Sequence, residues 1–332
     1  MKLPSFLHSR LALGLAAGLF LAACSKSDNT AESSSSSSSS AAKKPIVVGF
    51  AQTGAESQWR TANTKSLQDE AKARGITLKF VDCQSKPENQ IKAVHDFITQ
   101  KVDAIVIAPI KSTGWDEALQ DAKSAGIPVI VEDRNVDADK SLYKCFIGSN
   151  FTKEGQMVAD WLIKKTGGKG NIIELYGEPG SAAAENRHKA FADEIAKTDL
   201  KIIDSQTGMF QRDKGKEVME AMLKAHPKGS FDIVYAHNDD MALGAIQAIE
   251  AAGFKPGTDI MVVSIDGEKE AVQAVADGKI NCVVECNPMV GPLVFDAVEN
   301  VLAGKEVAPV TYNTDHVFDS TNAAAEAPKR PY

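Results

Sequence analysis

The sequence has 332 residues, of which 43% are hydrophobic and 24% are charged, and its formal net charge is −7. This is the composition of a globular protein of about two domains, and it excludes a collagen-like or wholly disordered chain. The negative charge argues against nucleic-acid binding, which needs an electropositive face to neutralise phosphates.

Residues 1–23 have the features of an export signal. Lys2 and Arg10 flank the start, and the apolar run from Leu11 to Ala23 is too short to span a bilayer comfortably. Small residues then lead directly to Cys24, so the segment resembles a bacterial lipoprotein signal, in which this cysteine is acylated and becomes the first mature residue. An ordinary signal peptide with a chance cysteine is the alternative. We expect a periplasmic or cell-surface lipoprotein, held at a membrane through the lipid on Cys24 only.

Residues 24–44 are expected to form a tether. They include eight consecutive serines, Ser33 to Ser40, and lack the apolar side chains whose burial would repay the entropy of ordering. We interpret the segment as a flexible connection between the lipidated Cys24 and a folded part that begins at residue 45.

Four cysteines follow the tether: Cys83, Cys145, Cys282 and Cys286. An exported protein can form disulfides, and four cysteines permit three complete pairings, among which the sequence does not choose. Cys282 and Cys286 are four residues apart in an expected strand, about 13 Å, which is too far for a bond between them. Because no Cys-x2-Cys pair is present and the six histidines are scattered, no metal site is predicted, and no cofactor is expected.

From residue 45 onward, short apolar runs alternate with amphipathic stretches. The runs at 46–50, 104–108 and 260–265 are almost continuously apolar, as in parallel strands that are covered on both faces. Glycine repeatedly follows a helical stretch, at Gly75 and Gly126 for example, where it suits the left-handed residue that closes a helix. This repeated helix-to-strand junction predicts an α/β fold with right-handed crossovers.

The number of expected strands indicates two lobes. About five strands lie in 45–148 and another five in 169–285, which is too many for one small sheet. We therefore predict two doubly wound parallel sheets, with a cleft between the carboxyl ends of their strands, where ligands of such sheets bind. The segment after residue 309 is expected to cross or wrap rather than to form a third domain.

Polar side chains collect just after the expected strands of both lobes. Carboxylate, amide and guanidinium groups can each bind two adjacent hydroxyls through forked hydrogen bonds, and an indole ring offers an apolar face to the C–H side of a sugar. The sequence therefore predicts a site for a small polyol. The residues concerned are Glu56, Trp59, Arg60, Asp133, Arg134, Arg187, Phe210, Asn238 and Asp266.

These residues also have simpler interpretations. A helix follows His237-Asn238, and Asp239 or Asp240 would cap it through backbone N–H groups. Glu56 would complement a helix dipole. Asp133 and Arg134 could form a surface ion pair, and Asp266 with Gly267 could form a simple turn. Trp59 and Phe210 could be core residues.

Signatures of catalysis are absent from the sequence. It contains no Gly-x-Ser-x-Gly, His-Glu-x-x-His or Gly-x-Gly-x-x-Gly motif, and no nucleophile motif accompanies His237. We expect a binding protein and not an enzyme. A transcription repressor with the same core would need a basic helix-turn-helix before residue 45, where the signal and the serines stand.

Five segments together resemble the periplasmic sugar-binding proteins of ABC importers, the ribose- and galactose-type class, and within it the galactofuranose-binding type. The narrowest is Glu-Ser-x-Trp-Arg, because ribose-type binders carry Asn and Phe there. One departure is Asn186-Arg187, where the class has Asp-Arg. The five segments are 56–60, 88–94, 214–220, 235–241 and 264–267.

The resemblance implies a type I periplasmic binding protein fold, two lobes joined by a three-strand hinge. The N-terminal lobe would comprise 45–148 plus 287–311, and the C-terminal lobe 149–286 plus 312–332. The implied ligand is a monosaccharide, galactofuranose or a related aldose. It would be contacted by Glu56, Arg60, Asp133, Arg187, Asn238 and Asp266 in a pocket lined by Trp59, Arg134 and Phe210.

The implied partners are the permease subunits of an ABC importer, and the chain itself is expected to be a monomer. A sensor that presents its sugar-bound form to a chemoreceptor or a histidine kinase is the alternative, since both roles use one fold and one site.

Overall fold

The structure is a computed structural model that describes residues 44–332, which form one compact unit. The predicted signal, Cys24 and the serine run lie outside these residues. Within 44–332, no helix is both long enough and apolar enough to cross a membrane.

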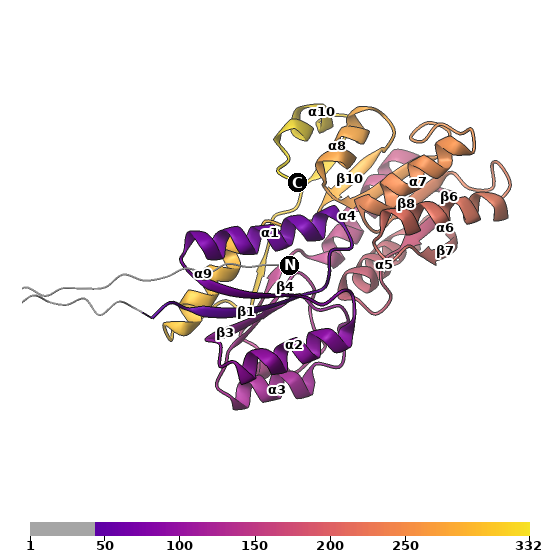
Figure 1. Cartoon of the computed structure of the whole chain (residues 1–332). Helices are drawn as coiled ribbons and strands as arrows, with labels where there is room; N and C mark the ends of the chain where they lie inside the picture. The colour runs from indigo at the N-terminus through magenta and orange to yellow at the C-terminus, as the bar shows by residue number, and fades with distance from the viewer. Residues whose placement is uncertain (1–43) are drawn as a thin grey trace, which may run out of the picture. The chain divides into compact units, whose positions relative to one another are not determined.

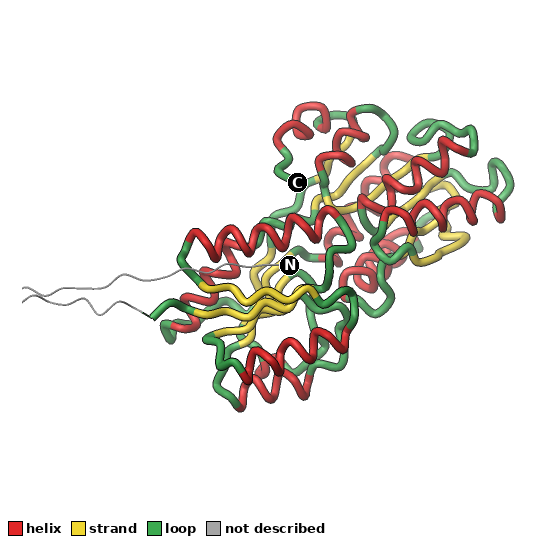
Figure 2. The backbone as a smooth tube through the Cα atoms, in the orientation of Figure 1, coloured by secondary structure: helices red, strands yellow, loops and turns green. Residues whose placement is uncertain are grey.

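The N-terminal lobe is built on a six-stranded sheet (Figures 1 and 2). Its elements are β1 (Val47–Gln52), α1 (Gln58–Ala73), β2 (Thr77–Asp82), α2 (Pro87–Thr99), β3 (Ala104–Ile107), α3 (Asp116–Ser124), β4 (Val129–Glu132), β5 (Cys145–Gly148), α9 (Gly291–Leu302) and β11 (Val310–Tyr312). The strand order is β11-β5-β4-β3-β1-β2, and every pairing is parallel. Helices α1 and α9 cover one face and α2 and α3 the other.

The apolar runs of the sequence follow from this two-sided cover. Successive side chains of a strand point to opposite faces of its sheet. Ile105 and Ile107 of β3 pack toward α2 and α3, whereas Ala104 and Val106 pack toward α1 and α9, and all four are fully buried. Both sets of positions therefore have to be apolar, so β3 shows no polar alternation.

The C-terminal lobe repeats this architecture. Its elements are α4 (Phe151–Thr166), β6 (Lys169–Tyr176), α5 (Ala182–Ile195), β7 (Asp199–Thr207), α6 (Arg212–Ala225), β8 (Ile233–Ala236), α7 (Asp239–Ala251), β9 (Met261–Asp266), α8 (Lys269–Ala276), β10 (Cys282–Glu285), β12 (Val317–Asp319) and α10 (Ala323–Glu326). The strand order is β12-β10-β9-β8-β6-β7. One pairing departs from the predicted parallel sheet, because β12 runs antiparallel to β10.

The chain passes between the two sheets three times, from β5 to α4, from β10 to α9 and from β11 to β12. The crossings are bonded to one another: Asn313 donates to the carbonyl of Asn287 at 2.9 Å, and the Ser149 hydroxyl donates to Asp315 at 3.0 Å. The two-lobed fold with three connecting segments is confirmed, whereas the residue numbers of the lobe boundaries stay a prediction.

The four described cysteines, Cys83, Cys145, Cys282 and Cys286, are free, buried thiols. Burial raises the pKa of each, so they stay protonated at neutral pH and are poor nucleophiles. None of the three possible pairings is therefore formed within this part of the chain.

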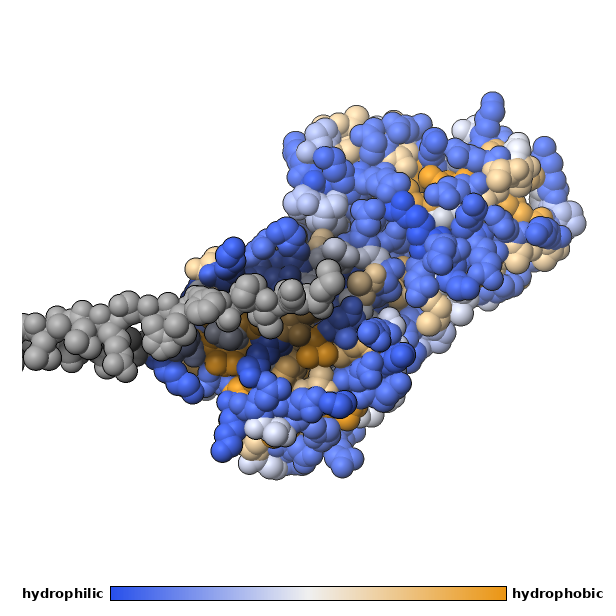
Figure 3. All heavy atoms as spheres, viewed as in Figure 1, coloured by the Kyte–Doolittle hydropathy of each residue, from blue (hydrophilic) through white to orange (hydrophobic). Residues whose placement is uncertain are grey.

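Most side chains on the face shown in Figure 3 are hydrophilic. Three of the exposed large apolar side chains, Met289, Leu293 and Leu302, lie in α9 or directly before it. The buried stripe of α9, which includes Val294 and Phe295, packs on the first sheet, so this helix is apolar on more than its core-facing side.

Candidate functional site

A cavity lies between the lobes, next to the carboxyl ends of strands from both sheets. The space that protein atoms leave free in it, its opening to solvent included, is about 290 Å³. This is room for one small molecule and not for an oligomer. The nine residues singled out in the sequence all line it, namely Glu56, Trp59, Arg60, Asp133, Arg134, Arg187, Phe210, Asn238 and Asp266.

The wall from the N-terminal lobe is a buried cluster of two acids and two arginines. Arg60, on α1, places Nη2 2.6 Å from Oδ2 of Asp133 and Nε 3.1 Å from Oε1 of Glu56. Arg134 approaches the same Glu56 oxygen with Nη2 at 3.4 Å. Asp133 and Arg134 directly follow β4 and are only 4% and 3% exposed, so they are not the surface ion pair that was the alternative.

The charges of this cluster stabilise one another. Burial alone would lower the pKa of Arg60, but Asp133 and Glu56 raise it above its usual value. Burial would raise the pKa of Glu56, but Arg60 and Arg134 hold it below 4.5. Burial and the neighbouring Arg60 lower the pKa of Arg134, although a guanidinium stays charged in proteins.

Apart from Oδ2 of Asp133, which is ion-paired with Arg60, three buried atoms of this cluster have no hydrogen-bond partner: Oε2 of Glu56, Nη1 of Arg60 and Nη1 of Arg134. An unsatisfied buried polar group costs roughly 1–3 kcal/mol, and such groups are rare in folded proteins. Here they offer one acceptor and two donors at the cavity wall. A hydroxyl both donates and accepts, so a polyhydroxylated ligand could satisfy all three.

Arg187, on α5, dominates the wall from the C-terminal lobe. Its Nε lies 2.6 Å from Oε2 of Glu154, its Nη1 donates to the carbonyl of His237 at 2.6 Å, and its Nη2 is 3.5 Å from Oδ1 of Asp266. Its guanidinium also lies 5.2 Å from the centroid of the Phe151 ring. These four contacts fix the guanidinium between the lobe core and the cavity.

The lining carries three carboxylates and three guanidiniums, and each arginine is paired with an acid of the cavity. An anionic ligand such as a sugar phosphate would meet the carboxylates, and a cation would meet the arginines. The balance of charge therefore favours a neutral, polar ligand.

Three lining residues have backbone conformations that side chains rarely adopt. Asp133, Phe210 and Asp266 have φ values of 57°, 61° and 138°. Such strain costs on the order of 1–3 kcal/mol at each position and concentrates at functional sites. The turn at Asp266-Gly267, proposed as a simple alternative, is present, and it also places the Asp266 carboxylate on the cavity.

Asn238 corrects the predicted helix cap. Its Oδ1 accepts from the backbone N–H of Met241 at 3.0 Å, so Asn238 is the N-cap of α7, and neither Asp239 nor Asp240 is. The carboxylate of Asp239 instead accepts from the backbone amides of Gly267 and Glu268 at 2.8 and 2.7 Å. The Asn238 amide nitrogen uses one hydrogen on the Phe210 carbonyl, which leaves the second for a ligand.

The C-terminal end of the chain also holds the Asp266 turn. The Arg330 guanidinium donates to the carbonyl of Gly267 at 2.8 Å, and the Tyr332 hydroxyl donates to that of Asp266 at 3.2 Å. Arg330 is in turn paired with Glu285 at 2.6 Å. The turn is thus fixed on both of its carbonyl groups.

Two aromatic rings complete the cavity. Trp59 is 5% exposed and its indole N–H donates to the carbonyl of Cys286 at 2.6 Å, so it is buried as a core residue would be and yet faces the cavity. The Phe210 ring packs directly on Gly177, where an added Cβ would lie 2.2 Å from it. Only glycine leaves room for the ring at this position.

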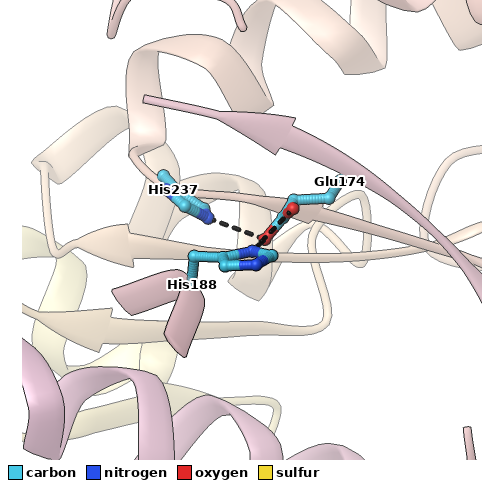
Figure 4. A group of neighbouring side chains, drawn as sticks. All are labelled: Glu174, His188 and His237. Carbon is cyan, nitrogen blue, oxygen red and sulfur yellow. Dashed lines mark hydrogen bonds and ion pairs between the residues drawn. The ribbon is translucent and has the colours of Figure 1, made fainter. Parts of the chain in front are cut away.

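Glu174, His188 and His237 form a tight trio behind this wall (Figure 4). Each histidine places a ring nitrogen 2.9 Å from Oε1 of Glu174. The other nitrogen of His237 accepts from the backbone N–H of Gly177 at 3.3 Å, so its proton sits on Nε2 and points at Glu174. A metal-bound histidine instead donates its outer N–H, and we therefore interpret the trio as a hydrogen-bond network.

The trio supports the binding wall from behind. Burial would raise the pKa of Glu174, but hydrogen bonds from His188 and His237 lower it below 4.5, and burial lowers the pKa of His237. An ionised Glu174 therefore anchors a neutral His237, whose carbonyl accepts from Arg187.

Four lining residues were not predicted: Ser57, Phe151, Ala183 and Cys286. Ser57 lies inside the segment on which the resemblance rests. Cys286 directly follows β10, and Phe151 and Ala183 lie in the first turns of α4 and α5. The only sequence feature that could have indicated these residues is their position, directly after a strand or at the start of the following helix.

A sequence family described as the periplasmic binding protein domain matches residues 48–306. The chain belongs to this family. A curated relative, the galactofuranose-binding protein YtfQ of Escherichia coli K12, is 51% identical over 260 residues, which cover 77% of this chain and 81% of that protein.

Two solved structures are similar to this chain to almost the same degree. The binding protein of the arabinose ABC transporter from Shewanella sp. ANA-3, bound to α- and β-L-arabinofuranose, is 49% identical with a TM-score of 0.84, over 86% of this chain and 96% of that one. A protein of Mycobacterium smegmatis in complex with β-D-fucofuranose is 48% identical with a TM-score of 0.83, over 85% and 94%.

Proposed function

We propose that this periplasmic binding protein takes up one neutral furanose monosaccharide between its lobes and delivers it to the permease of an ABC importer. The observation that carries the proposal is the interlobe cavity of about 290 Å³ with unpaired buried donors and acceptors on its wall. The three relatives described above are furanose-binding or furanose-bound proteins, and their 48–51% identity to this chain supports the same ligand class.

Each predicted residue has a proposed role toward the sugar. Carboxylate oxygens accept from hydroxyls, guanidinium and amide groups donate, and aromatic rings cover C–H faces. The proposed acceptors are Glu56, Asp133 and Asp266. The proposed donors are Arg60, Arg134, Arg187 and Asn238, and the proposed apolar faces are Trp59 and Phe210.

We further propose that the chain releases its sugar chemically unchanged and acts as a monomer. The carboxylates of the cavity are paired with arginines, so no lone acid and base face each other across a scissile position. The sensor role remains the alternative, and uptake of labelled sugar by cells that lack the importer separates the two roles.

Calorimetry on the chain, stripped of ligand in denaturant and refolded, tests the proposal. We expect one site for a ¹³C-labelled aldose from a panel of D-galactose, L-arabinose, D-fucose and D-ribose. The ¹³C spectrum of the bound sugar should show the furanose ring, and mass spectrometry after long incubation should return the sugar intact. Binding of none of these sugars contradicts the proposal, and a bound pyranose contradicts the furanose assignment.

The proposed lipid anchor gives a separate prediction. Two or more acyl chains on Cys24 would hold the protein durably at a membrane, since each buried CH₂ contributes about 0.8 kcal/mol. Cys24→Ala is expected to move the protein to the soluble fraction and to abolish labelling with palmitate, while sugar binding stays unchanged. A variant that still sediments with membranes and still labels would contradict the anchor.

A further inference from the structure

Helix α1 begins at the mouth of the sugar cavity, and its first backbone amides have no partner within the helix. An α-helix leaves its first N–H groups free. Ser57, the N-cap, accepts one of them, from Arg60, at 3.0 Å. The first turn contains no acidic residue of its own, so the amides of Gln58 and Trp59 need acceptors from elsewhere.

Both acceptors come from the opposite lobe. The amide of Gln58 donates to Oδ2 of Asp240, on α7, at 2.8 Å. The amide of Trp59 donates to Oε1 of Glu268, the residue before α8, also at 2.8 Å. The two carboxyl groups therefore cap a helix that belongs to the other half of the molecule.

The two acids are held for this contact. Oδ1 of Asp240 accepts from Arg212 at 2.7 Å, which leaves Oδ2 for α1. Glu268 is fully buried, and its Oε2 has no hydrogen-bond partner. Burying a carboxyl group with an unpaired oxygen costs free energy. The hydrogen bond that Glu268 accepts from the amide of Trp59 is therefore the contact that explains why an acid is buried here.

We propose that Asp240 and Glu268 form an interlobe latch, which stabilises the closed cleft by capping α1 and thereby sets how slowly the sugar leaves. The inference rests on the proposed sugar-binding function. Neither residue lines the sugar cavity beside Arg60 and Trp59, so both act as positioning residues. When the lobes part, the two amides lose their acceptors.

The latch also gives a pH dependence. Burial, with Asp240 and Asp239 on α7, raises the pKa of Glu268 to about 9, and Arg212 on α6 opposes the rise. Asp266 on β9 is a further acid facing it. In the open form the pKa would return toward 4.5, so closing takes up a proton. Closure is then fully favoured below about pH 4.5 and weakens as the pH rises toward 9.

Four variants test the latch. Glu268→Ala removes the acceptor, and we expect the sugar to leave at least about tenfold faster, as for an unsatisfied buried amide. Asp240→Ala should give a smaller increase of the same kind. Glu268→Gln keeps an acceptor oxygen without the titration of Glu268, so it should release the sugar slowly and with a weaker dependence on pH than the wild type. Asp103→Ala is the control. The Asp103 carboxylate accepts a hydrogen bond from the backbone amide of Val47 at 2.7 Å, and both residues lie in the same lobe.

Release of D-galactose is followed by intrinsic tryptophan fluorescence, to which Trp59 contributes from the cavity wall. Opening is followed without sugar by maleimide labelling. Cys286 lies in the cavity wall, so it labels when the cleft opens, whereas Cys145 lies in β5 and labels when the lobe unfolds. Mass spectrometry distinguishes the two thiols. Glu268→Ala should raise the labelling rate of Cys286 and not that of Cys145.

The outcomes separate the two proposals. The latch is contradicted if Glu268→Ala and Asp240→Ala both release sugar and label Cys286 at the wild-type rates. It is also contradicted if Asp103→Ala speeds up sugar release as much as the two latch variants do. A wild-type chain that binds no sugar contradicts the proposed function instead, and a rise in Cys286 labelling in Glu268→Ala then still supports the latch.

Discussion

Arg187→Ala is expected to lower the free energy of unfolding by about 3–5 kcal/mol, because it leaves a buried carboxylate without its partner. Glu154 is fully buried, and its Oε2 is 2.6 Å from Nε of Arg187, while its Oε1 has no hydrogen-bond partner. The substitution also removes the donor to the His237 carbonyl. Urea unfolding followed by tryptophan fluorescence measures the loss.

A second substitution separates stability from binding. Glu154→Gln in the Arg187→Ala background removes the stranded charge, so it should recover a large part of the lost stability. Sugar binding should stay lost, because the donor at the cavity wall is still missing. An Arg187→Ala chain that unfolds at the wild-type urea concentration would show that Glu154 does not depend on this ion pair.

The fold could be read from the sequence because its signals are local. The alternation of buried strands and helices and the glycine after each helix depend on neighbouring residues, as at β3 and at Gly126. β12 was not predicted, since three residues are too few to show a period. Its antiparallel direction is set by pairing with β10, more than thirty residues earlier in the chain.

The cavity lining was largely predictable for the same reason. Residues that follow parallel strands collect at one edge of each sheet, which brings Asp133 and Asp266 to the cleft. The roles of neighbouring acids were not predictable. Asn238 and Asp239 are both good capping residues, and the choice between them depends on Gly267, a partner 28 residues away from Asp239.

Contacts between the lobes carry no sequence signal. Asp240 and Gln58 are 182 residues apart, and Glu268 and Trp59 are 209 apart. Nothing in the local pattern marks Glu268 as a buried acid, since it precedes a helix as many surface glutamates do. Such residues become visible only once the two halves of the molecule are placed together.

Asp133→Asn and Asp266→Asn are each expected to weaken sugar binding by at least about tenfold. A buried hydrogen bond to a charged group contributes roughly 1.5–3 kcal/mol, and 1.4 kcal/mol corresponds to one decade in the dissociation constant. Asparagine is the matched change, because it has the shape of aspartate and, like aspartate, tolerates a positive φ such as the 57° of Asp133. Calorimetry with the sugar that binds the wild-type chain measures the effect.

The fold should survive these two substitutions, in contrast to Arg187→Ala. Arg60 keeps Glu56 at 3.1 Å when Asp133 is neutral, and Arg187 keeps Glu154 at 2.6 Å when Asp266 is neutral. No buried guanidinium is left alone, so the urea midpoints should stay close to that of the wild type. The loss of affinity then has to come from the altered carboxyl group at the sugar. Full-strength binding by both variants would place the sugar outside this cavity and leave the paired acids of the two lobes without a ligand to hold.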